Sequence, residues 1–327
     1  MNYRTEHFEL KAPSELDKAT WISIRKGETR LGQEVLLVAE GTEDWKQKRY
    51  HILGICEDLG PRANGGFGGS ERAFSAFIQR FMAVQSNRFL NGKAIAVHGV
   101  VLPLGGQSLK SLNELVSELD ELVSAWVKQV VEEGGIPIVI GGGHNNAYGL
   151  IKGSSLALNK AIHSINLDPH ADTRDLEGRH SGNPFSYAWK EGFLEHYTVL
   201  GLHESYNNEA ILQRLDEMKA TVAYFESWID DPGSFRENVE KASEQLAEKS
   251  LGIELDLDSM HYMPSSAFTP SGISVEQARF YVRKLARLKQ VCYLHLPEGA
   301  PKTEKEEIIV GKTLVYLVTD FIKCNGK

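Results

Sequence analysis

Three potential metal ligands, Asp168, His170 and Asp172, follow the apolar run 161–167 at intervals of two residues. On an extended backbone, alternate side chains point to the same side, so these three can face one site. Two carboxylates and one imidazole suit a hard or borderline divalent cation such as Mn²⁺ better than a metal that prefers thiolates. The pattern alone also allows a solvated polar loop, but two similar clusters elsewhere in the chain favour a metal site.

The second cluster contains one candidate ligand, His144, which follows three glycines at the end of the apolar run 136–140. The glycines predict a tight turn that places His144 at the start of a helix. A single histidine is more often a structural residue, but a position directly after a strand, like that of Asp168, favours a ligand. Phosphate binding is a weaker alternative because no Lys-Ser/Thr pair follows the glycines, as a P-loop requires.

The third cluster alternates acidic and apolar residues and contains Glu254, Asp256 and Asp258. On a strand these carboxylates line one face, and in a low-dielectric setting they repel one another unless a cation neutralises them. A solvent-facing acidic edge is the alternative. The six candidate ligands are His144, Asp168, His170, Asp172, Asp256 and Asp258. Four carboxylates and two imidazoles exceed the need of one ion, which indicates two divalent ions that share bridging carboxylates.

A glycine-rich stretch at 57–69 contains two further candidates, Arg62 and Asn64. Its glycines allow positive φ angles and a close approach of the backbone to a ligand. They do not follow the G-x-G-x-x-G spacing, so a dinucleotide site is not supported. A structural turn and a loop that contacts substrate are equally compatible with this stretch.

Eight short apolar runs alternate with segments of helical periodicity, which predicts βαβ units and a parallel sheet covered on both faces. The runs are 51–56, 94–102, 136–140, 162–167, 197–202, 221–225, 251–257 and 291–296. Capping boxes at Ser111, Ser274 and Thr303 predict helix starts, with the first of these helices ending near 132 and the last near 323. We expect a single domain over 1–327, with 1–48 as an N-terminal extension. The candidate ligands follow strands, where ligands bind in open α/β sheets.

Composition limits the class of protein and its partners. The chain has 327 residues, 42% hydrophobic and 24% charged, which is ordinary for a soluble globular protein. A net charge of −8 argues against nucleic acid or an anionic membrane as a partner. No apolar run is long enough for a transmembrane helix, and residues 1–7 do not resemble a signal peptide. The odd number of cysteines, Cys56, Cys292 and Cys324, predicts reduced thiols in a cytoplasmic protein.

The three clusters, taken in order, resemble the metal motifs of the ureohydrolases, the arginase-like amidino and formimino hydrolases. The matching runs are Gly-Gly-Gly-His at 141–144, Asp-Pro-His-Ala-Asp at 168–172 and Asp-Leu-Asp at 256–258. The glycine-rich loop and the run 297–301 are also similar to the family, and the resemblance spans about 50–320. It implies a three-layer α/β/α fold with an eight-stranded, mainly parallel sheet, two Mn²⁺ ions, and a homotrimer or homohexamer. It also implies Asp168 and Asp256 as the bridging ligands.

Departures from the arginase motifs narrow the implied substrate. Arginases and agmatinases carry a histidine shortly after the Asp-x-His-x-Asp motif, and the corresponding position here is Phe185, after Ser181-Gly182-Asn183-Pro184. This run and Arg174 instead resemble formimidoylglutamases. His180 is an alternative proton donor, although a surface histidine fits the sequence equally well. The Asp-Pro pair that usually follows the last motif is replaced by Ser259-Met260, which leaves the metal geometry less defined.

The resemblance implies hydrolysis of a linear amidine C–N bond, with N-formimidoyl-L-glutamate converted to L-glutamate and formamide by a metal-bridging hydroxide. In this scheme Asp172 receives a proton from the water and Glu298 pairs with the cationic amidinium. The implied substrate contacts are Arg174, Arg179, Ser181, Asn183, Arg62 and Asn64. A guanidino hydrolase of the arginase or agmatinase type is the alternative enzyme. A catalytically silent binding or scaffold protein is the alternative of another class.

Overall fold

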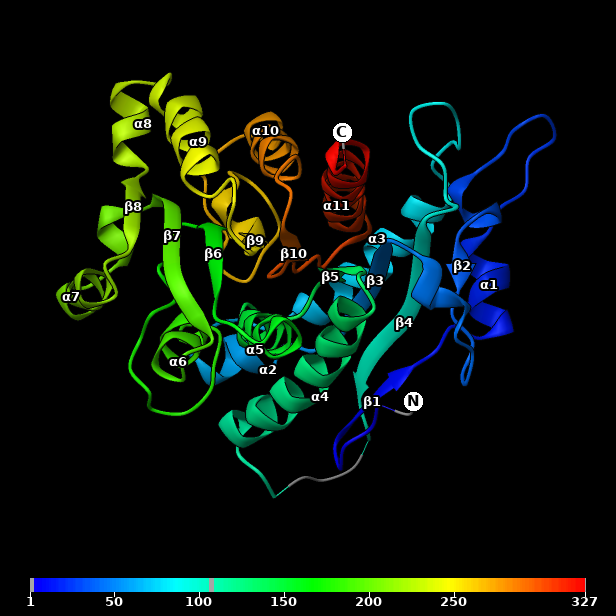
Figure 1. The fold of residues 1–327 in the computed structure, drawn as a ribbon, viewed down its shortest axis with the longest axis horizontal. Helices are drawn as coiled ribbons and strands as arrows, with labels where there is room; N and C mark the ends of the chain where they lie inside the picture. The colour runs from blue at the N-terminus through cyan, green and yellow to red at the C-terminus, as the bar shows by residue number, and fades with distance from the viewer. Residues whose placement is uncertain (1–2, 106–108, 327) are drawn as a thin grey trace.

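The computed structural model describes residues 3–105 and 109–326. Its elements form three layers, a central sheet between two layers of helices (Figure 1). The strands are β1 (Phe8–Lys11), β2 (Leu36–Leu37), β3 (Tyr50–Ile55), β4 (Ile95–Pro103), β5 (Ile136–Ile140), β6 (Ile162–Leu167), β7 (Leu194–Leu202), β8 (Thr221–Tyr224), β9 (Leu251–Leu255) and β10 (Val291–Leu296). The α/β/α class predicted from the alternation of apolar runs is confirmed.

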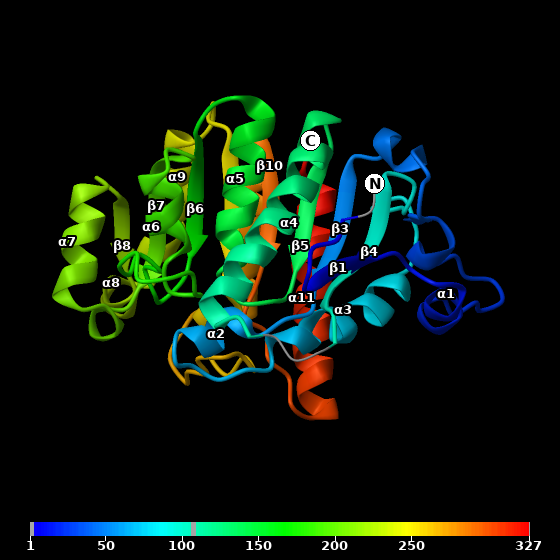
Figure 2. The same cartoon turned by 90° about the horizontal axis from the view of Figure 1, so that it is seen from below.

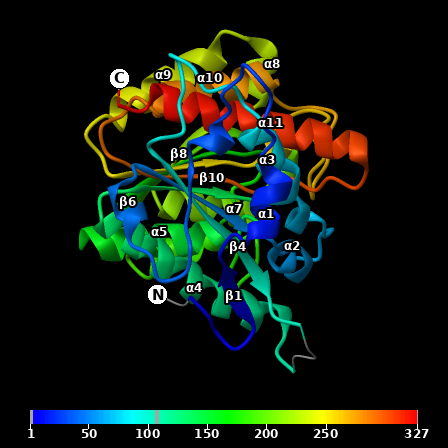
Figure 3. The same ribbon diagram turned by 90° about the vertical axis from the view of Figure 1, so that its right-hand side faces the viewer.

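The helices cover both faces of the sheet, as the side view in Figure 3 shows. The α-helices are α1 (Glu15–Trp21), α2 (Leu59–Ala63), α3 (Ala73–Met82), α4 (Leu112–Glu132), α5 (Asn146–Leu158), α6 (Pro184–Lys190), α7 (Glu209–Glu217), α8 (Glu226–Asp230), α9 (Ser234–Gln245), α10 (Val275–Leu285) and α11 (Glu304–Cys324). Short 3₁₀ helices are η1 (Leu31–Gln33), η2 (Asp44–Gln47), η3 (Ser70–Arg72), η4 (Glu204–Tyr206) and η5 (Leu257–Ser259). None of the helices in the described part of the chain is long and apolar enough to cross a bilayer.

Strand order in the sheet is β1-β4-β3-β5-β10-β9-β6-β7-β8, with β2 paired to β4. All eight predicted runs form strands, β3 to β10, and they pair in parallel. The expected count of eight strands was wrong, because the described sheet has ten. Part of the N-terminal extension joins it: β1 pairs antiparallel and β2 parallel with β4. These two strands have four and two residues, too few for a periodic pattern to mark them.

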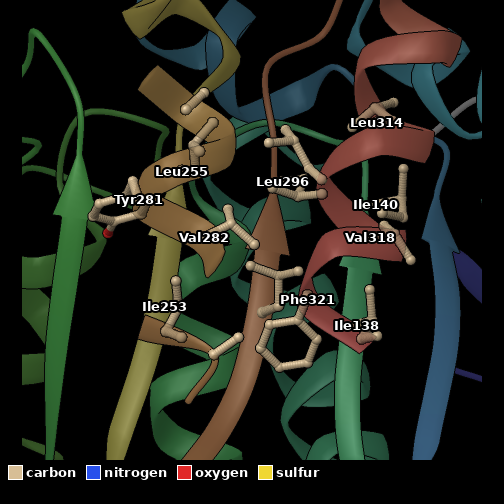
Figure 4. Packing of buried hydrophobic residues seen from close by; sticks show 14 of the residues in the cluster. Ile138, Ile140, Ile253, Leu255, Tyr281, Val282, Leu296, Leu314, Val318 and Phe321 are labelled. Carbon is tan, nitrogen blue, oxygen red and sulfur yellow. The ribbon is translucent and has the colours of Figure 1, made fainter. Parts of the chain in front are cut away.

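Two apolar cores lie on opposite faces of the sheet because successive side chains of a strand alternate between faces. On one face, residues of α10 and α11 pack on β5, β9 and β10 (Figure 4). Val318 and Phe321, both fully buried, belong to this layer, and Trp126 of α4 belongs to the other. Burial of each such side chain contributes roughly 1.5–3 kcal/mol before the entropic cost of ordering.

The predicted capping boxes are confirmed at the N-termini of α4, α10 and α11. The side chains of Ser111, Ser274 and Thr303 each accept a hydrogen bond from the backbone three residues later. These caps satisfy donors that the first helical turn leaves unpaired. They fix where each helix begins, and therefore the length of the loop that precedes it.

Five adjacent parallel strands, β3, β5, β10, β9 and β6, end at the same edge of the sheet. The chain passes from β5 through α5 to β6, so it crosses over the places of β10 and β9. Figure 2 shows the loops that follow these strands gathered with α2 at this edge. Open α/β sheets bind ligands outside the carboxyl ends of their strands, at the point where the direction of the strand order changes.

Candidate metal centre

His144, which follows β5, lies against three carboxylates from two other strand ends. Its Nδ1 atom is 3.1 Å from Asp168 Oδ2 and 3.0 Å from Asp172 Oδ2. The same nitrogen is 3.0 Å from Asp256 Oδ2, which follows β9. The four ligand atoms lie within 4.8 Å of one another and form a first group that could hold a cation.

A second group shares Asp168 with the first. His170 Nδ1 lies 3.5 Å from Asp168 Oδ1 and 3.3 Å from Asp258 Oδ2. These three residues also offer ligand atoms within 4.8 Å of one another. Asp168 belongs to both groups because its two oxygens face different imidazoles, and its implied bridging role stays a prediction. Asp256 contributes to the first group only, so its implied bridging role stays a prediction.

Local backbone features place these side chains. Gly141 and Gly142 have φ angles of 82° and 70°, which let the chain turn sharply from β5 and present His144 just ahead of α5. Asp172 and Glu298 also have positive φ angles, 50° and 67°. For non-glycine residues this conformation is strained, and such strain clusters at functional sites.

The alternation predicted that Glu254, Asp256 and Asp258 line one face of a strand, and this prediction was wrong. The strand ends at Leu255, and Asp256 caps the 3₁₀ turn η5, its Oδ1 accepting the N–H of Asp258 at 2.8 Å. Glu254, the last acidic residue inside the strand, instead faces the imidazole Nε2 of His144 at 3.5 Å. A turn therefore brings Asp256 and Asp258 to the cluster and separates them from Glu254.

Burial decides between a metal site and the solvated alternatives. Asp168, Asp256 and Asp258 are at most 3% exposed, so neither a solvated loop nor a solvent-facing acidic edge describes them. Burial, followed by repulsion from Asp258 and Asp168, raises the pKa of Asp256 well above its usual value. Burial also raises the pKa of Asp258 to about 6, against the attraction of His170.

In the two imidazoles, the nearby carboxylates outweigh burial and favour the charged form. Burial opposes the charged form of His144, but Asp168, Asp172 and Asp256 outweigh it and raise the pKa of His144 well above its usual range. Burial likewise opposes the charged form of His170, and Asp258 and Asp168 raise its pKa. The cluster therefore attracts positive charge at both groups.

The donor atoms fit divalent cations. Within the described ranges, neither ring nitrogen of His144 has a hydrogen-bond partner, and Asp258 Oδ1 also has none. A buried polar atom without a partner is costly, and buried carboxylates this close together repel one another. Cations held by the two groups would satisfy these atoms and neutralise the carboxylates, and carboxylate with imidazole is a donor set that Mn²⁺ accepts.

A cavity of about 280 Å³ opens onto the cluster. The predicted residues that line it are Asn64, His170, Asp172, Arg174, Ser181, Asp256, Asp258 and Glu298. Arg174 is half-exposed, and its Nη1 donates to Asn64 Oδ1 at 2.8 Å. A cavity of about 370 Å³ beside His98 contains none of the candidate ligands, and His98 is engaged with His51 and Trp126. The smaller cavity is therefore the candidate substrate pocket.

Arg179 does not line the pocket, contrary to its predicted substrate role. It is 4% exposed, and its Nε donates to Asp120 Oδ2 of α4 at 2.8 Å. Its other nitrogens donate to Asn183 Oδ1 and to the carbonyl of Asn145. All three nitrogens of the guanidinium thus donate hydrogen bonds inside the protein, where they anchor the loop 173–183.

Three more of the predicted catalytic and substrate-binding residues, Arg62, Asn183 and His180, are also absent from the pocket lining. Arg62 is exposed and lies 3.2 Å from Asp58. Asn183 is buried, and its side chain joins Arg179 to the carbonyls of Asp175 and Gly178.

His180 is 3% exposed, so it is not a surface histidine, and it does not line the pocket either. Its Nδ1 accepts the N–H of Gly182 at 3.1 Å, and its Nε2 lies 2.9 Å from Asn183 Nδ2 and 3.4 Å from Glu177 Oε1. Its ring nitrogens therefore face its own loop, and the geometry gives it no route to a substrate proton.

Phe185, at the position where arginases and agmatinases carry a histidine, is fully buried behind the site. Its ring stacks on that of Tyr197, with 4.3 Å between the ring centroids. It meets the ring of His144 edge-on, with 5.4 Å between the centroids. It supplies packing for the candidate ligand and has no proton to transfer.

Two site residues escaped the sequence predictions as functional candidates. The Oγ of Ser266 donates to Glu298 Oε2, and Glu298 Oε1 accepts the N–H of His144 at 2.7 Å. Glu57 accepts N–H groups from Gly143 and Leu59, and so ties the glycine turn to the loop after β3. Glu57 could have been found from the sequence, because it follows an apolar run of strand length, as Asp168 does. Ser266 lies in a loop and does not follow such a run.

The fold and the site together define a layered α/β protein with a carboxylate and imidazole cluster at the carboxyl ends of a parallel sheet. Residues 89–321 match the sequence profile of the arginase family, about 70% of the chain. The chain therefore belongs to the arginase family.

Individual relatives agree with this membership. A formimidoylglutamase of Hahella chejuensis is 36% identical over 117 residues, and this match covers 32% of the chain and 36%, about a third, of the relative's length. A formimidoylglutamase of Psychrobacter cryohalolentis is 25% identical over 285 residues, 80% of each chain. The crystal structure of Trypanosoma cruzi formiminoglutamase with Mn²⁺ superposes with a TM-score of 0.74 at 20% identity, over 90% of this chain and 97% of that one.

Proposed function

We propose that this protein hydrolyses the C–N bond of N-formimidoyl-L-glutamate, giving L-glutamate and formamide, with two Mn²⁺ ions as cofactors. One observation carries the proposal: two groups of ligand atoms share Asp168 at a cavity that Arg174 also lines. The two relatives described above are formimidoylglutamases, and the solved structure described with them is a formiminoglutamase with Mn²⁺.

His144, Asp168, Asp172 and Asp256 would hold one cation, and Asp168, His170 and Asp258 the other. When bound, such a pair acts as a Lewis acid and lowers the pKa of water enough to supply a nucleophile at neutral pH.

In this proposal, Glu298 binds the amidinium of the substrate. It lines the cavity, is 3% exposed, and is held by the N–H of His144 and the hydroxyl of Ser266. Burial, followed by repulsion from Asp256, raises the pKa of its carboxyl to about 8. A cationic amidinium favours the ionised form, so substrate binding and ionisation of Glu298 support each other.

Asp172 and Arg174 take the remaining roles. Asp172, itself one of the candidate ligands, lines the cavity, accepts the proton of the attacking water and passes it to the nitrogen that leaves with L-glutamate. Arg174, two residues later, presents its guanidinium to the cavity with Asn64 as its support. A guanidinium binds a carboxylate through two parallel hydrogen bonds, which orients the glutamate part of the substrate.

A substrate panel in the presence of Mn²⁺ tests this function. We expect turnover of formimidoylglutamate and little of arginine, agmatine or guanidinobutyrate. Turnover of arginine with none of formimidoylglutamate would assign a guanidino hydrolase instead. Failure on every substrate, together with no retained metal, would favour the silent binding protein. Cytoplasmic location and assembly into trimers or hexamers stay predictions from the family resemblance and the composition.

A further inference from the structure

A buried carboxylate, Glu254, lies behind the candidate ligand His144, outside the substrate cavity. It is fully buried in the middle of the sheet, on β9. Its Oε1 accepts the hydroxyl of Tyr293 at 2.7 Å, and its Oε2 faces His295 Nδ1 at 2.6 Å. The same Oε2 lies 3.5 Å from His144 Nε2, so one oxygen is placed between two imidazoles.

The neighbouring strand fixes this carboxylate. Glu254 and His295 are paired in the register of β9 and β10, and Tyr293 lies two residues earlier on the same face of β10. An ionised carboxylate in a sheet interior is costly, and an apolar group of similar size is often as stable or more so. A carboxylate at this position therefore points to a role in placing another group.

The two nitrogens of His144 face different carboxylates. Nδ1 is within about 3 Å of Asp168, Asp172 and Asp256, whereas Glu254, at 3.5 Å, is the carboxylate that Nε2 faces among the described residues. A neutral imidazole carries one proton, and only the nitrogen without it can bind a cation. With no acceptor behind the ring, the three carboxylates would draw the proton to Nδ1 and block that nitrogen.

We propose that Glu254 is a positioning residue that keeps the His144 proton on Nε2 and so leaves the Nδ1 lone pair directed at the first cation group. That two cations bind is taken from the proposed function, on which this proposal rests. It predicts that Glu254 controls the affinity of one cation only, because the group of Asp168, His170 and Asp258 contains no nitrogen of His144.

Of the two side chains that contact Glu254 on β10, His295 faces the oxygen that also faces His144, and Tyr293 faces the other oxygen. His295 Nε2 has no hydrogen-bond partner among the described residues. Because His295 Nδ1 must donate to a carboxylate, its proton stays on that side of the ring. Removal of the Tyr293 hydroxyl leaves the oxygen that faces both imidazoles unchanged, which makes Tyr293→Phe a matched control.

Titration of chelator-treated, full-length protein with Mn²⁺, followed by calorimetry, tests the role of Glu254. We expect wild type and Tyr293→Phe to bind two ions. Glu254→Gln should bind one ion with wild-type affinity and the other about 10- to 100-fold more weakly, the effect usually seen when the partner of a ligating histidine is removed. Turnover by Glu254→Gln should recover at high Mn²⁺, because the change lowers affinity and leaves the substrate pocket intact.

Two results would overturn the proposal: two unchanged affinities in Glu254→Gln, or an equal loss of both ions together with a lower melting temperature, which indicates a structural role only. If Glu254→Gln does not fold, Glu254→Asp retains the charge but withdraws it from His144, and an unchanged pair of affinities there would also refute it. Formimidoylglutamate takes no part in the titration, so a selective loss of one ion supports the role of Glu254 even if the panel refutes the substrate.

Discussion

At the scale of single residues, Glu298 combines a strained backbone with a buried acidic group. Its folded-state pKa of about 8 lies above the ordinary value of 4.5. At pH values between about 4.5 and 8, folding of the metal-free protein therefore takes up a proton. The stability that the protonated form contributes is lost as the pH rises through the folded-state pKa of about 8. A raised pKa at a candidate substrate contact is typical of functional sites.

Glu298→Gln should weaken this pH dependence. Between about pH 4.5 and 8, the free energy of unfolding of the chelated variant should fall less steeply than that of wild type, by up to about 1.4 kcal/mol per pH unit. Turnover should fall at least about 100-fold, because the amidinium loses its charged partner. Urea unfolding at several pH values and kcat measurements check both, and parallel pH profiles would contradict the assigned environment of Glu298.

Asp256→Ala should separate stability from activity. Asp258 and Asp168 repel the Asp256 carboxylate in the metal-free protein, so its removal should leave the melting temperature of the chelated protein unchanged or higher. Turnover should fall by more than about 100-fold. Removal of a residue that only supports a metal ligand already lowers metal affinity or activity by about 10- to 100-fold. Wild-type turnover in this variant would remove the site from where the structure places it.

The sequence predicted which candidate ligands lie together better than it predicted which residues line the pocket, for a physical reason. His144 and Asp168 follow apolar strands, and the ends of parallel strands meet at one edge whatever the details of packing. Arg179 was misassigned because its partner, Asp120, lies 59 residues away on α4, and no local pattern reveals that contact. The location of Glu254 behind His144 depends in the same way on the register of β9 and β10.

At the scale of elements, the loop 173–183 carries both a pocket residue and its anchor. Arg174 faces the cavity, whereas Arg179 pairs with Asp120 on α4 and lies over the rings of Tyr148 and Tyr187. Burial raises the pKa of Asp120 to about 6, against the attraction of Arg179. The pair therefore fixes the position of the loop at a considerable desolvation cost.

Substitution of the two arginines should give opposite results. Arg179→Met leaves Asp120 buried and unpaired, which should lower the free energy of unfolding by about 3–5 kcal/mol. The KM of the folded fraction should stay near that of wild type. Arg174→Met should leave stability nearly unchanged and raise the KM for formimidoylglutamate about 10- to 100-fold, because a hydrogen-bonded charge pair with the substrate is lost.

The double variant Arg179→Met with Asp120→Leu serves as the control for the anchor. Replacement of both partners by apolar groups should restore much of the stability, because no charge then remains buried. A raised KM in Arg179→Met, with unchanged stability, would restore the substrate role that the sequence suggested.

At the scale of the whole molecule, the candidate ligands join segments that follow β5, β6 and β9: His144 lies 24 residues before Asp168 and 112 residues before Asp256. In the metal-free protein the carboxylates repel one another across these segments. Cations that bind the folded state alone stabilise it by about 2.7 kcal/mol when their concentration is 100 times the dissociation constant. At roughly 2.1 cal/mol/K per residue, a chain of 327 residues unfolds with an entropy of about 0.7 kcal/mol/K, so we expect the melting temperature to rise by about 4 °C for each Mn²⁺ ion bound.

Calorimetric melting of the chelated and Mn²⁺-loaded protein measures this coupling. Asp256→Ala should melt at or above the chelated wild type but gain less from Mn²⁺, since the first group has lost an oxygen ligand. Arg179→Met should melt lower in both states yet keep the full gain, because the anchor contributes to folding and not to the cation groups. Equal melting temperatures of the wild type with and without Mn²⁺ would show that the carboxylate and imidazole cluster does not hold cations in the folded protein.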